Sequence, residues 1–576
     1  MSVRETTFDV LRRAGLTTVF ANPGSTEVAL LGGLPDDLTF VLGLHEGSVV
    51  GMATGWAMGH DAPALAVLHT TAGLGNAVGA IATARVNRVP LVVLVGQQDR
   101  RHLALEPFLA GRLTGLAGDY PVWVDQPVRA QDVPGAVARA AHEAVTFRGP
   151  ALVVVPMDDW DAPYEEEVLA APARVLRPPA RPGTGDGGAP EGDLASLAEL
   201  VGGARAPVVV AGAGACRAWE PLVALAELLG CPVWQEPFGA RAGFPQDHPL
   251  FAGVLPADRP RLRAALAGHD VVLAVGAPVF RQYAYAPGPL VEPGTRVALV
   301  TDDPSEAHRS PVELACLADP ATTCAHLAAL LSARLPRAAA LPEAGALPET
   351  GRLPEADGLP GTARLPEADG LPGTDRLPEA ARLAVPPVPA GGRPLRSAHV
   401  LRELARRLTA DAVLVEELPS ARPDLHRLVP ARNPLGFVSA AMGGLGFALP
   451  AAVGLRMALP GRPVVAVTGD GSALYGLHAL WSAAHYRAGA LFVVLSNSRY
   501  AVLDRLAEQH GAKVPWPAFT EVDVRGLARS LGCPSLRVET HAELTAALDE
   551  VMPALAAREE PLLLDVTVAV DADYRP

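Results

Sequence analysis

One pattern recurs along the 576-residue chain: a short apolar run ends in small or polar residues and is followed by a stretch of helical character. In "VVAVTGDGSALYG" at 464–476, apolar residues give way to Gly469-Asp470-Gly471-Ser472. Similarly, "TTVFA" precedes "NPGS", "FVLGL" precedes "HEGS" and "ALAVL" precedes "HTTAGLGNA". Apolar strands that alternate with helices are typical of parallel sheets buried on both faces. The pattern therefore predicts an α/β fold of doubly wound parallel sheets.

Two segments of different composition divide this pattern into three units. The segment "PPARPGTGDGGAPEG" at 178–192 is rich in proline and glycine and predicts a first boundary. Within 341–382 the pair Leu-Pro recurs every six residues, which excludes a helix and disrupts strand pairing. We therefore expect domains at 1–178, 193–335 and 393–576, with 336–392 as an extended linker. Docking of a partner to the repeat is the alternative.

The composition narrows the classes of function. Acidic residues outnumber basic ones by 62 to 48, which argues against nucleic acid or an anionic membrane as the main partner. The five cysteines form no CxxC pair, so neither a disulfide framework nor a zinc site is indicated. No uncharged run approaches the ~20 residues of a membrane helix, and the N-terminal "MSVRETTFDVLRRAGL" lacks the apolar core of a signal peptide. We expect a cytoplasmic enzyme.

Two strand ends predict a metal-bridged diphosphate site. The run "ALFVVLSNSRY" at 490–500 ends in a small polar group, as the run at 464–472 does. Because the carboxyl ends of parallel strands gather at one edge, we expect Asp470 and Asn497 to face one place. A carboxylate and an amide oxygen suit Mg²⁺ or Ca²⁺, and the backbone N–H groups of Gly471 and Ser472 at a helix start suit a diphosphate. The alternative is an ordinary turn.

These strand ends resemble the thiamine diphosphate (ThDP) signature of the pyruvate decarboxylase/acetolactate synthase superfamily, in which GDG is followed by Asn at the next strand end. Stretches similar to the benzoylformate decarboxylases of that superfamily run from residue 22 to residue 500, among them "NPGSTEVALL", "LHEGSVVGMATGWA", "LHTTAGLGNAVGAI" and "MGGLGFALPAAVG". The resemblance implies a pyrimidine-binding domain, a central domain and a diphosphate-binding domain, in that order. It also implies ThDP and Mg²⁺ as cofactors and a homodimer or homotetramer.

Glu46 is the expected activator of the cofactor. It begins an apolar helix, and its neighbours Val49, Val50 and Met52 suggest that it is buried. A buried carboxyl group has a raised pKa and can hold or pass a proton near neutral pH. The alternative is an exposed acid favoured by the helix macrodipole. By resemblance, Glu46 is the carboxyl group that bonds the aminopyrimidine ring of ThDP.

The resemblance assigns roles to further residues, each of which has a structural alternative as a cap, a turn or a core residue. Ser25 would contact the substrate carboxylate and His69 would relay protons, so the expected catalytic set is Glu46, His69 and Ser25. The expected ThDP contacts are Glu46, Asn22, Ser420, Gly443, Leu445, Gly471 and Ser472. The expected metal ligands are Asp470, Asn497 and the backbone carbonyl of Arg499.

Three positions depart from the benzoylformate decarboxylase pattern. Tyr283, in "GAPVFRQYAYAPG", stands where those enzymes have a second active-site histidine, and tyrosine is a poor base at pH 7. Val502 and Leu506 stand where they have alanine and phenylalanine. The expected substrate pocket of Ser25, His69, Tyr283, Val502 and Leu506 therefore differs from a pocket for benzoylformate.

The central unit carries part of a dinucleotide-binding fingerprint. The strand "APVVVAGAGA" at 206–215 contains Gly212 and Gly214, but Arg217 stands where the third glycine belongs. We expect a structural role for these glycines.

The function that the resemblance implies is the non-oxidative decarboxylation of a small 2-oxo acid to an aldehyde and CO₂ by a ThDP- and Mg²⁺-dependent lyase. One alternative is a ThDP-dependent carboligase or lyase of the acetolactate synthase or aldehyde lyase type. Another is a ThDP-binding protein without turnover.

Overall fold

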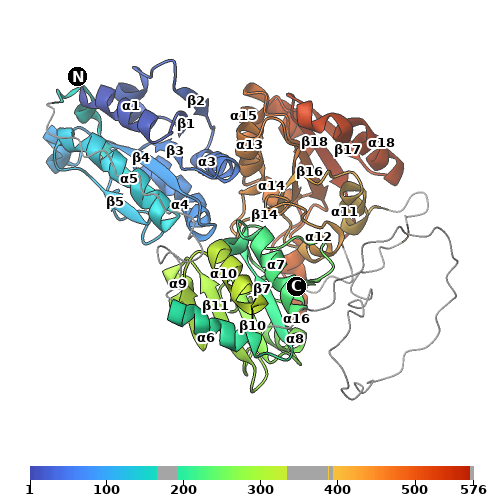
Figure 1. The fold of residues 1–576 in the computed structure, drawn as a ribbon. Helices are drawn as coiled ribbons and strands as arrows, with labels where there is room; N and C mark the ends of the chain where they lie inside the picture. Colours follow the sequence, from blue (N-terminus) through green and yellow to red (C-terminus); the bar gives the residue numbers. More distant parts are fainter. Residues whose placement is uncertain (165–190, 334–386, 388–393, 571–576) are drawn as a thin grey trace.

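The computed structural model describes residues 1–164, 191–333, 387 and 394–570. These residues form three six-stranded parallel sheets, each with helices packed against it (Figure 1). The predicted α/β fold of three doubly wound sheets is thereby confirmed. The expected linker at 336–392 lies outside the described residues except for position 387, and the domain boundaries stay predictions. In the described ranges, no helix is long and apolar enough to cross a membrane.

The first sheet lies in the N-terminal lobe, drawn in blue in Figure 1, with strand order β2-β1-β3-β4-β6-β5. Val92 and Val93 belong to separate cores, because helices cover both faces of this sheet. The strands are β1 (Thr18–Asn22), β2 (Thr39–Leu42), β3 (Ala64–Leu68), β4 (Leu91–Gln97), β5 (Trp123–Asp125) and β6 (Pro150–Pro156). The helices are α1 (Val3–Arg13), α2 (Val28–Leu31), α3 (Glu46–His60), α4 (Thr70–Val86) and α5 (Val133–Phe147), with 3₁₀ turns η1 (Ser25–Glu27), η2 (Arg100–Leu105), η3 (Ala130–Asp132) and η4 (Met157–Asp161).

The second sheet forms the central lobe, drawn in green to yellow, with strand order β12-β11-β10-β7-β8-β9. Its two faces again bury separate cores, one with Val209 and the other with Val208. The strands are β7 (Pro207–Ala211), β8 (Val233–Gln235), β9 (Phe251–Val254), β10 (Val271–Val275), β11 (Arg296–Thr301) and β12 (Leu314–Leu317). The helices are α6 (Glu191–Gly202), α7 (Trp219–Leu229), α8 (Arg259–Ala265), α9 (Pro304–Arg309) and α10 (Pro320–Ser332), with the 3₁₀ turn η5 (Ala213–Ala215).

The third sheet forms the C-terminal lobe and has strand order β14-β13-β15-β16-β18-β17, the same permutation as the first sheet. The strands are β13 (Val413–Glu417), β14 (Val438–Ser439), β15 (Val464–Gly469), β16 (Leu491–Ser496), β17 (Ser535–Val538) and β18 (Leu562–Thr567). The helices are α11 (Ser397–Ala405), α12 (Arg422–Leu428), α13 (Ala448–Ala458), α14 (Asp470–Ala473), α15 (Ala479–His485), α16 (Ala501–Gln509), α17 (Val524–Ser530) and α18 (His541–Val551), with the 3₁₀ turn η7 (Met552–Ala557).

Helices α3 and α13 pack against each other and join the N-terminal and C-terminal lobes (Figure 1). Each follows an edge strand of its sheet, α3 after β2 and α13 after β14. A Cβ on Gly55 would lie 2.1 Å from the carbonyl oxygen of Ala451, and a Cβ on Gly454 would lie 1.9 Å from that of Met52. The contacts are reciprocal, because in each helix the glycine lies three residues after the carbonyl that the other glycine meets. The two helix backbones touch, and one hydrophobic core runs through both lobes.

The three lobes meet around the end of α4. The side chain of Asn87 donates to the carbonyl of Ser439 at 3.0 Å and accepts from the N–H of Ala441 at 2.9 Å, which ties the N-terminal lobe to the C-terminal lobe. The adjacent Arg88 pairs with Asp302 of the central lobe at 2.6 Å. Arg281 of the central lobe donates to the carbonyl of Ala441 at 3.2 Å. Polar contacts therefore fix each lobe to the other two.

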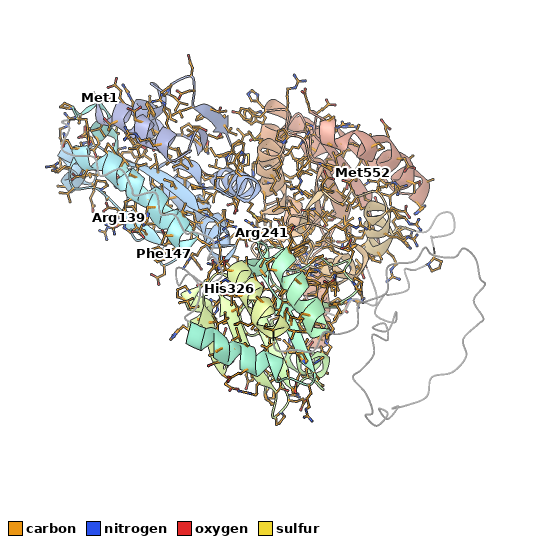
Figure 2. The ribbon with its side chains drawn as sticks, in the orientation of Figure 1. Met1, Arg139, Phe147, Arg241, His326 and Met552 are labelled. Carbon is orange, nitrogen blue, oxygen red and sulfur yellow. The ribbon has the colours of Figure 1, made fainter. Side chains whose placement is uncertain are left out.

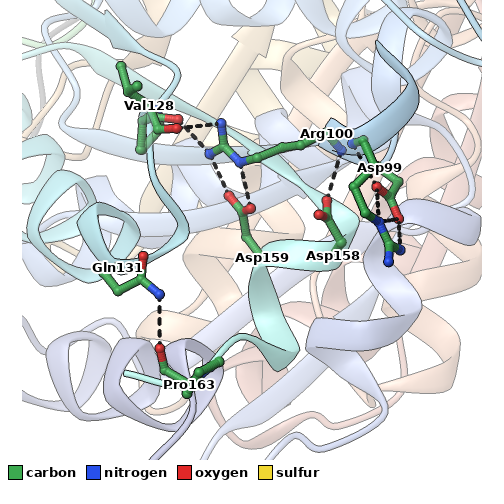
Figure 3. A network of polar contacts seen from close by, with 9 residues as sticks. Asp99, Arg100, Val128, Gln131, Asp158, Asp159 and Pro163 are labelled. Atoms are coloured by element: carbon green, nitrogen blue, oxygen red, sulfur yellow. Dashed lines mark hydrogen bonds and ion pairs between the residues drawn. The ribbon is translucent and has the colours of Figure 1, made fainter. Parts of the chain in front are cut away.

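A polar network holds the chain where it leaves β4 (Figure 3). Two guanidinium nitrogens of Arg100 donate to the two carboxylate oxygens of Asp159, each at 2.6 Å, and Asp159 is 1% exposed. The backbone N–H of Arg100 donates to Asp158, and its guanidinium also donates to the carbonyl of Val128, both at 3.0 Å. A buried, two-pronged ion pair of this kind gives rigid geometry. The end of β4 is thereby fixed against η4.

Candidate active site

Glu46 lies at the first position of α3 and is 8% exposed. Its Oε1 accepts from the side-chain amide of Asn22 at 2.9 Å, and its Oε2 accepts from that of Asn76 at 3.0 Å. The carboxyl group is therefore held between β1 and α4. The structure brings the predicted residues Glu46 and Asn22 together. It also adds Asn76, which sequence reasoning missed although it lies within the quoted stretch "LHTTAGLGNAVGAI".

His69 follows β3 and occupies the N-cap position of α4. Its Nδ1 lies 3.0 Å from Oε2 of Glu27 and 3.0 Å from the hydroxyl of Thr26. A Cβ on Gly73 would lie 3.4 Å from Cβ of His69 and 3.5 Å from Cγ of Glu46. His69 and Glu46 therefore flank the same glycine. Sequence reasoning did not find Glu27, whose only signal is an acid two residues after the predicted Ser25.

Ser25 opens η1, three residues after the end of β1, and is exposed. Because β2, β1 and β3 are neighbours in the first sheet, Ser25, Glu46 and His69 come from three adjacent strand ends. Thr70, next to His69, has a φ of +33°, which costs free energy for a β-branched residue and is typical of functional sites. The structure gathers the predicted catalytic set at the carboxyl edge of one sheet.

Asp470 directly follows β15 and is 5% exposed. Its Oδ1 accepts from the N–H of Gly471 at 2.8 Å, and its Oδ2 accepts from those of Asn497 at 2.8 Å and Ser498 at 2.5 Å. Since β15 pairs with β16, Asp470 and Asn497 lie at neighbouring strand ends, as the sequence predicted. Burial raises the pKa of Asp470 although these N–H groups favour the charged form. A cation beside the carboxylate would therefore stabilise its charge.

The turn after Asp470 differs from the predicted helix start. Helix α14 is a single turn, and the longer helix α15 (Ala479–His485) follows it after a short interval. A Cβ on Gly471 would lie 2.8 Å from the ring of Tyr500, so that ring covers the turn. Ser472 is 6% exposed. The side chain of Arg499 is half exposed and points toward Asp504, with 3.8 Å between the charged atoms.

Gly443 and Leu445 lie in the loop between β14 and α13. Gly443 has a φ of +74°, and Leu445 is 40% exposed. The loop is held by Glu417, which ends β13 and accepts from the backbone N–H groups of 446–448 at 2.7–2.8 Å. Burial raises the pKa of Glu417 to about 7, although the three N–H donors act to lower it. Sequence reasoning missed Glu417, whose only signal is an acid at the end of the apolar strand "VLVEE".

The remaining predicted residues lie in all three lobes. Ser420 is half-buried in the turn before α12. Val502 and Leu506 are half-buried and four residues apart on α16, which places them on one helix face. Tyr283 lies in the central lobe and is 68% exposed. Among the described residues, no hydrogen bond joins Tyr283 to Ser25 or His69.

A cavity where the three lobes meet contains none of the predicted site residues; Arg241, labelled in Figure 2, is part of its wall. Gly214 lines this cavity, and a Cβ on Gly212 or Gly214 would lie 2.4 Å or 2.8 Å from the backbone of Gly276. The close approach of the β7 and β10 ends therefore accounts for both glycines. This contact supports the structural role expected for them.

Comparison with known proteins agrees with this geometry. Three family descriptions match consecutive parts of the chain: the N-terminal TPP binding domain of thiamine pyrophosphate enzymes at 1–114, the central domain at 194–327 and the C-terminal TPP binding domain at 421–566. Thiamine pyrophosphate is ThDP. Each match falls on one of the three sheets.

Relatives are similar over the whole length. Benzoylformate decarboxylase from Pseudomonas aeruginosa is 38% identical over 98% of both chains. The solved structure of the Rhodococcus jostii ThDP-dependent 4-hydroxybenzoylformate decarboxylase has a TM-score of 0.85 at 34% identity and covers 99% of this chain and 100% of its own. Benzoylformate decarboxylase from Polynucleobacter necessarius has a TM-score of 0.82 at 31% identity, with 100% and 99% covered. The chain therefore belongs to the thiamine pyrophosphate enzyme family and is similar throughout to benzoylformate decarboxylases.

Proposed function

We propose that the chain is a ThDP-dependent 2-oxo acid decarboxylase, a carbon–carbon lyase that forms an aldehyde and CO₂. The observation that carries this proposal is the gathering of Ser25, Glu46 and His69 at one sheet edge in a chain of this family. Two of the relatives described above are named for benzoylformate and one for 4-hydroxybenzoylformate, which are 2-oxo acids. The same class of substrate fits this chain.

The residues present fit ThDP and Mg²⁺. Asp470 and Asn497 offer a carboxylate and an amide oxygen at neighbouring strand ends, and the backbone carbonyl of Arg499 lies two residues further on; hard oxygen donors of this kind suit Mg²⁺. The N–H group of Ser472 suits the diphosphate, whereas that of Gly471 donates to Asp470 in this structure. When bound, ThDP supplies the electron sink that decarboxylation requires.

Each remaining residue has one task in this proposal. Glu46, fixed by two amide donors, would hold the proton shared with the aminopyrimidine ring. His69 accepts a proton near the reacting carbonyl and returns it. Ser25, exposed at the tip of η1, donates to the substrate carboxylate. Leu445 would present an apolar side chain to the cofactor, and the carbonyl of Gly443 would accept from the amino group of the cofactor.

Assembly into a homodimer or homotetramer is part of the proposal. Leu105 and Phe108, which follow β4, are 82% and 88% exposed. Large apolar side chains exposed close together are typical of protein interfaces. The cytoplasmic location expected from the sequence stays a prediction.

The test is a screen of the purified protein, loaded with ThDP and Mg²⁺, against aromatic and aliphatic 2-oxo acids, with CO₂ and aldehyde both measured. Equal yields of CO₂ and aldehyde from at least one acid support the proposal. CO₂ with a 2-hydroxy ketone in place of the aldehyde would establish the carboligase instead. Tight ThDP binding without CO₂ from any acid would establish the binding protein without turnover. His69→Ala is the inactive reference, and Asp549→Ala, at an exposed surface position, is the matched control.

A further inference from the structure

Glu27 is a buried acid to which the proposal above gives no task. It ends η1 and is 2% exposed. Its Oε2 accepts from the N–H of Gly24 at 2.7 Å and lies 3.0 Å from Nδ1 of His69, while its Oε1 accepts from the hydroxyl of Thr26. A buried carboxylate without such partners would be strongly destabilising. These partners therefore hold the carboxylate of Glu27 in one fixed position.

The hydrogens around His69 can be assigned by counting donors. The Thr26 hydroxyl has one hydrogen, which it donates to Glu27, and an ionised carboxylate has none. The two oxygens that lie 3.0 Å from Nδ1 of His69 are therefore both acceptors. Nδ1 carries the hydrogen that they share, and in the neutral ring Nε2 carries the lone pair.

Two glycines leave the space for this arrangement. A Cβ on Gly24 would lie 2.4 Å from Cγ and Nδ1 of His69. A Cβ on Gly96, in β4, would lie 1.6 Å from Oε1 of Glu27 and 2.4 Å from the hydroxyl oxygen of Thr26. Any side chain at either position would displace the pair. Glycine is therefore required at both positions, because Gly24 faces the imidazole and Gly96 faces the carboxylate.

Hydrogen bonds and an ion pair at its carboxyl end hold strand β4 in position beside Glu27. Its last residue, Gln97, donates to the carbonyl of Gly111 at 2.7 Å and accepts from the N–H of Gly111 at 3.2 Å. Three residues further on, Arg100 is tied to the buried Asp159 (Figure 3). A larger residue at 96 would therefore move Glu27 rather than the strand.

We propose that Glu27 is a positioning residue that fixes His69 in the tautomer with the hydrogen on Nδ1, so that Nε2 is the atom that accepts and returns protons, and that Gly96 reserves the space for its carboxylate. The proton that Nε2 takes up comes from the substrate side and goes back to it, while the Nδ1 hydrogen stays on the ring. Only the use of Nε2 in turnover rests on the proposed function. The simpler role of Glu27, a cap on the N–H of Gly24, gives the imidazole no preferred tautomer.

The first test reads the tautomer without substrate. The full chain is labelled with ¹⁵N in the histidine rings, His69 is assigned by comparison with His69→Gln, and long-range ¹H–¹⁵N correlations are recorded at pH 8. The wild type should show the hydrogen on Nδ1. Glu27→Ala should move it to Nε2, the preferred site in a free imidazole, whereas Glu27→Gln, which keeps an acceptor oxygen, should leave it on Nδ1. A wild-type hydrogen on Nε2, or an unchanged tautomer in Glu27→Ala, would overturn the inference.

The second test uses Gly96→Ala, which removes no ionisable group and only displaces the Glu27 carboxylate. It should change the His69 tautomer as Glu27→Ala does, while Gly135→Ala, at a position with open space around it, should not. In turnover, Glu27→Ala should lower kcat about 100-fold, the scale of general acid–base catalysis, with KM changed less than about twofold. Glu27→Gln should recover most of kcat.

The outcomes keep the two proposals apart. If Glu27→Ala does not fold, the spectra of the wild type and Gly96→Ala decide the inference. If no 2-oxo acid is decarboxylated, the proposed function fails while the spectra still test the tautomer. If the wild type turns over and Glu27→Ala has the same kcat, the inference fails and the proposed function stands.

Discussion

At the residue scale, Asp470, the proposed metal ligand, also holds two turns of the fold together. Its carboxylate ties the turn after β15 to the turn after β16 through three backbone N–H groups. Burial nevertheless raises the pKa of Asp470, so keeping its carboxylate charged costs free energy. A divalent cation beside it would remove that cost and favour the charged form.

Asp470→Ala should abolish the retention of ThDP. The diphosphate would lose the metal that bridges it to the protein, and the affinity for ThDP should fall more than about 100-fold, beyond the effect of changing an outer-shell partner of a metal. Isothermal titration calorimetry with Mg²⁺ measures this, with Asp549→Ala as control. EDTA should weaken ThDP binding to the wild type in the same way. A variant that binds ThDP as tightly as the wild type does, even with EDTA present, would contradict the metal site.

His426, in α12, makes the C-terminal lobe sensitive to acid. Its ring lies 5.0 Å from that of Phe437, and neither nitrogen has a hydrogen-bond partner among the described residues. Burial lowers the pKa of His426 to about 4, from 6.5, and Arg422 adds to this while Glu416 opposes it. Between these values the unfolded chain binds the proton and the folded chain does not. Stability therefore rises with pH from 4 to 6.5 and falls as the pH falls.

His426→Phe should remove this sensitivity. Between pH 7 and pH 5 the wild type should lose about 2 kcal/mol more of its free energy of unfolding than the variant does, from 1.36 kcal/mol per pH unit below 6.5. Urea titrations at the two pH values measure the difference. His510→Phe, at an exposed position, is the control and should behave as the wild type. Equal losses in wild type and His426→Phe would show that His426 titrates normally.

Sequence reasoning found residues that follow a recognisable strand end. It missed residues whose role is to hold another side chain or loop that lies far away in the sequence. Asp470 and Asn497 could be predicted as a pair because each ends an apolar run. Glu27 and Glu417 could not, because their partners are a histidine 42 residues away and three N–H groups about 30 residues away. Such contacts depend on which strands pair. A single sequence carries little of that information.

At the element scale, the strand positions were predictable and the helix contacts were not. The apolar run "ALAVL" is β3 residue for residue, and "ALFVVLSNSRY" contains β16. In contrast, the run of small residues in α3 indicated only burial. Its cause is the backbone contact with α13, where Gly55 and Gly454 each admit a carbonyl of the other helix.

Gly454→Ala should destabilise the chain although alanine is the better helix former. The new Cβ would lie 1.9 Å from the carbonyl oxygen of Met52, so the helices would have to separate. Overpacking costs about 1–3 kcal/mol or more, and an approach of 1.9 Å to a backbone oxygen places this variant at the upper end, above the gain of about 1 kcal/mol in helix propensity. Thermal melting measures the loss. Gly135→Ala in α5 is the matched control and should melt no lower than the wild type; equal melting temperatures of the two variants would contradict the contact.

At the scale of the whole molecule, the predicted site is divided between lobes. Glu46 and His69 lie on the N-terminal lobe, whereas Asp470 and Asn497 lie on the C-terminal lobe. In the superfamily that the chain resembles, the pyrimidine end of ThDP rests on one subunit and the diphosphate end on its neighbour. The proposed dimer would therefore build each site from the halves of two chains, around a two-fold axis.

Mixing two inactive variants should restore activity. In a heterodimer of Glu46→Gln and Asp470→Ala, one site receives both defects and the other receives neither, so up to half of its sites should work. Turnover after subunit exchange, with exchange confirmed by mass, measures this. Glu46→Gln mixed with His69→Ala is the control and should stay inactive, because both defects lie on the same lobe and each site keeps one. Exchange without recovery in the first mixture would contradict a shared site.

The reciprocal contact between α3 and α13 bears on the history of the chain. The two helices occupy the same place in sheets of the same strand order, and they meet through equivalent glycines. An arrangement of this kind is what the duplication of one ancestral gene for a self-pairing domain leaves behind, with the central lobe inserted between the copies. By such a descent, an interface between two identical molecules would become an internal contact between the two lobes. Each copy would then be free to diverge, one toward Glu46 and the other toward Asp470.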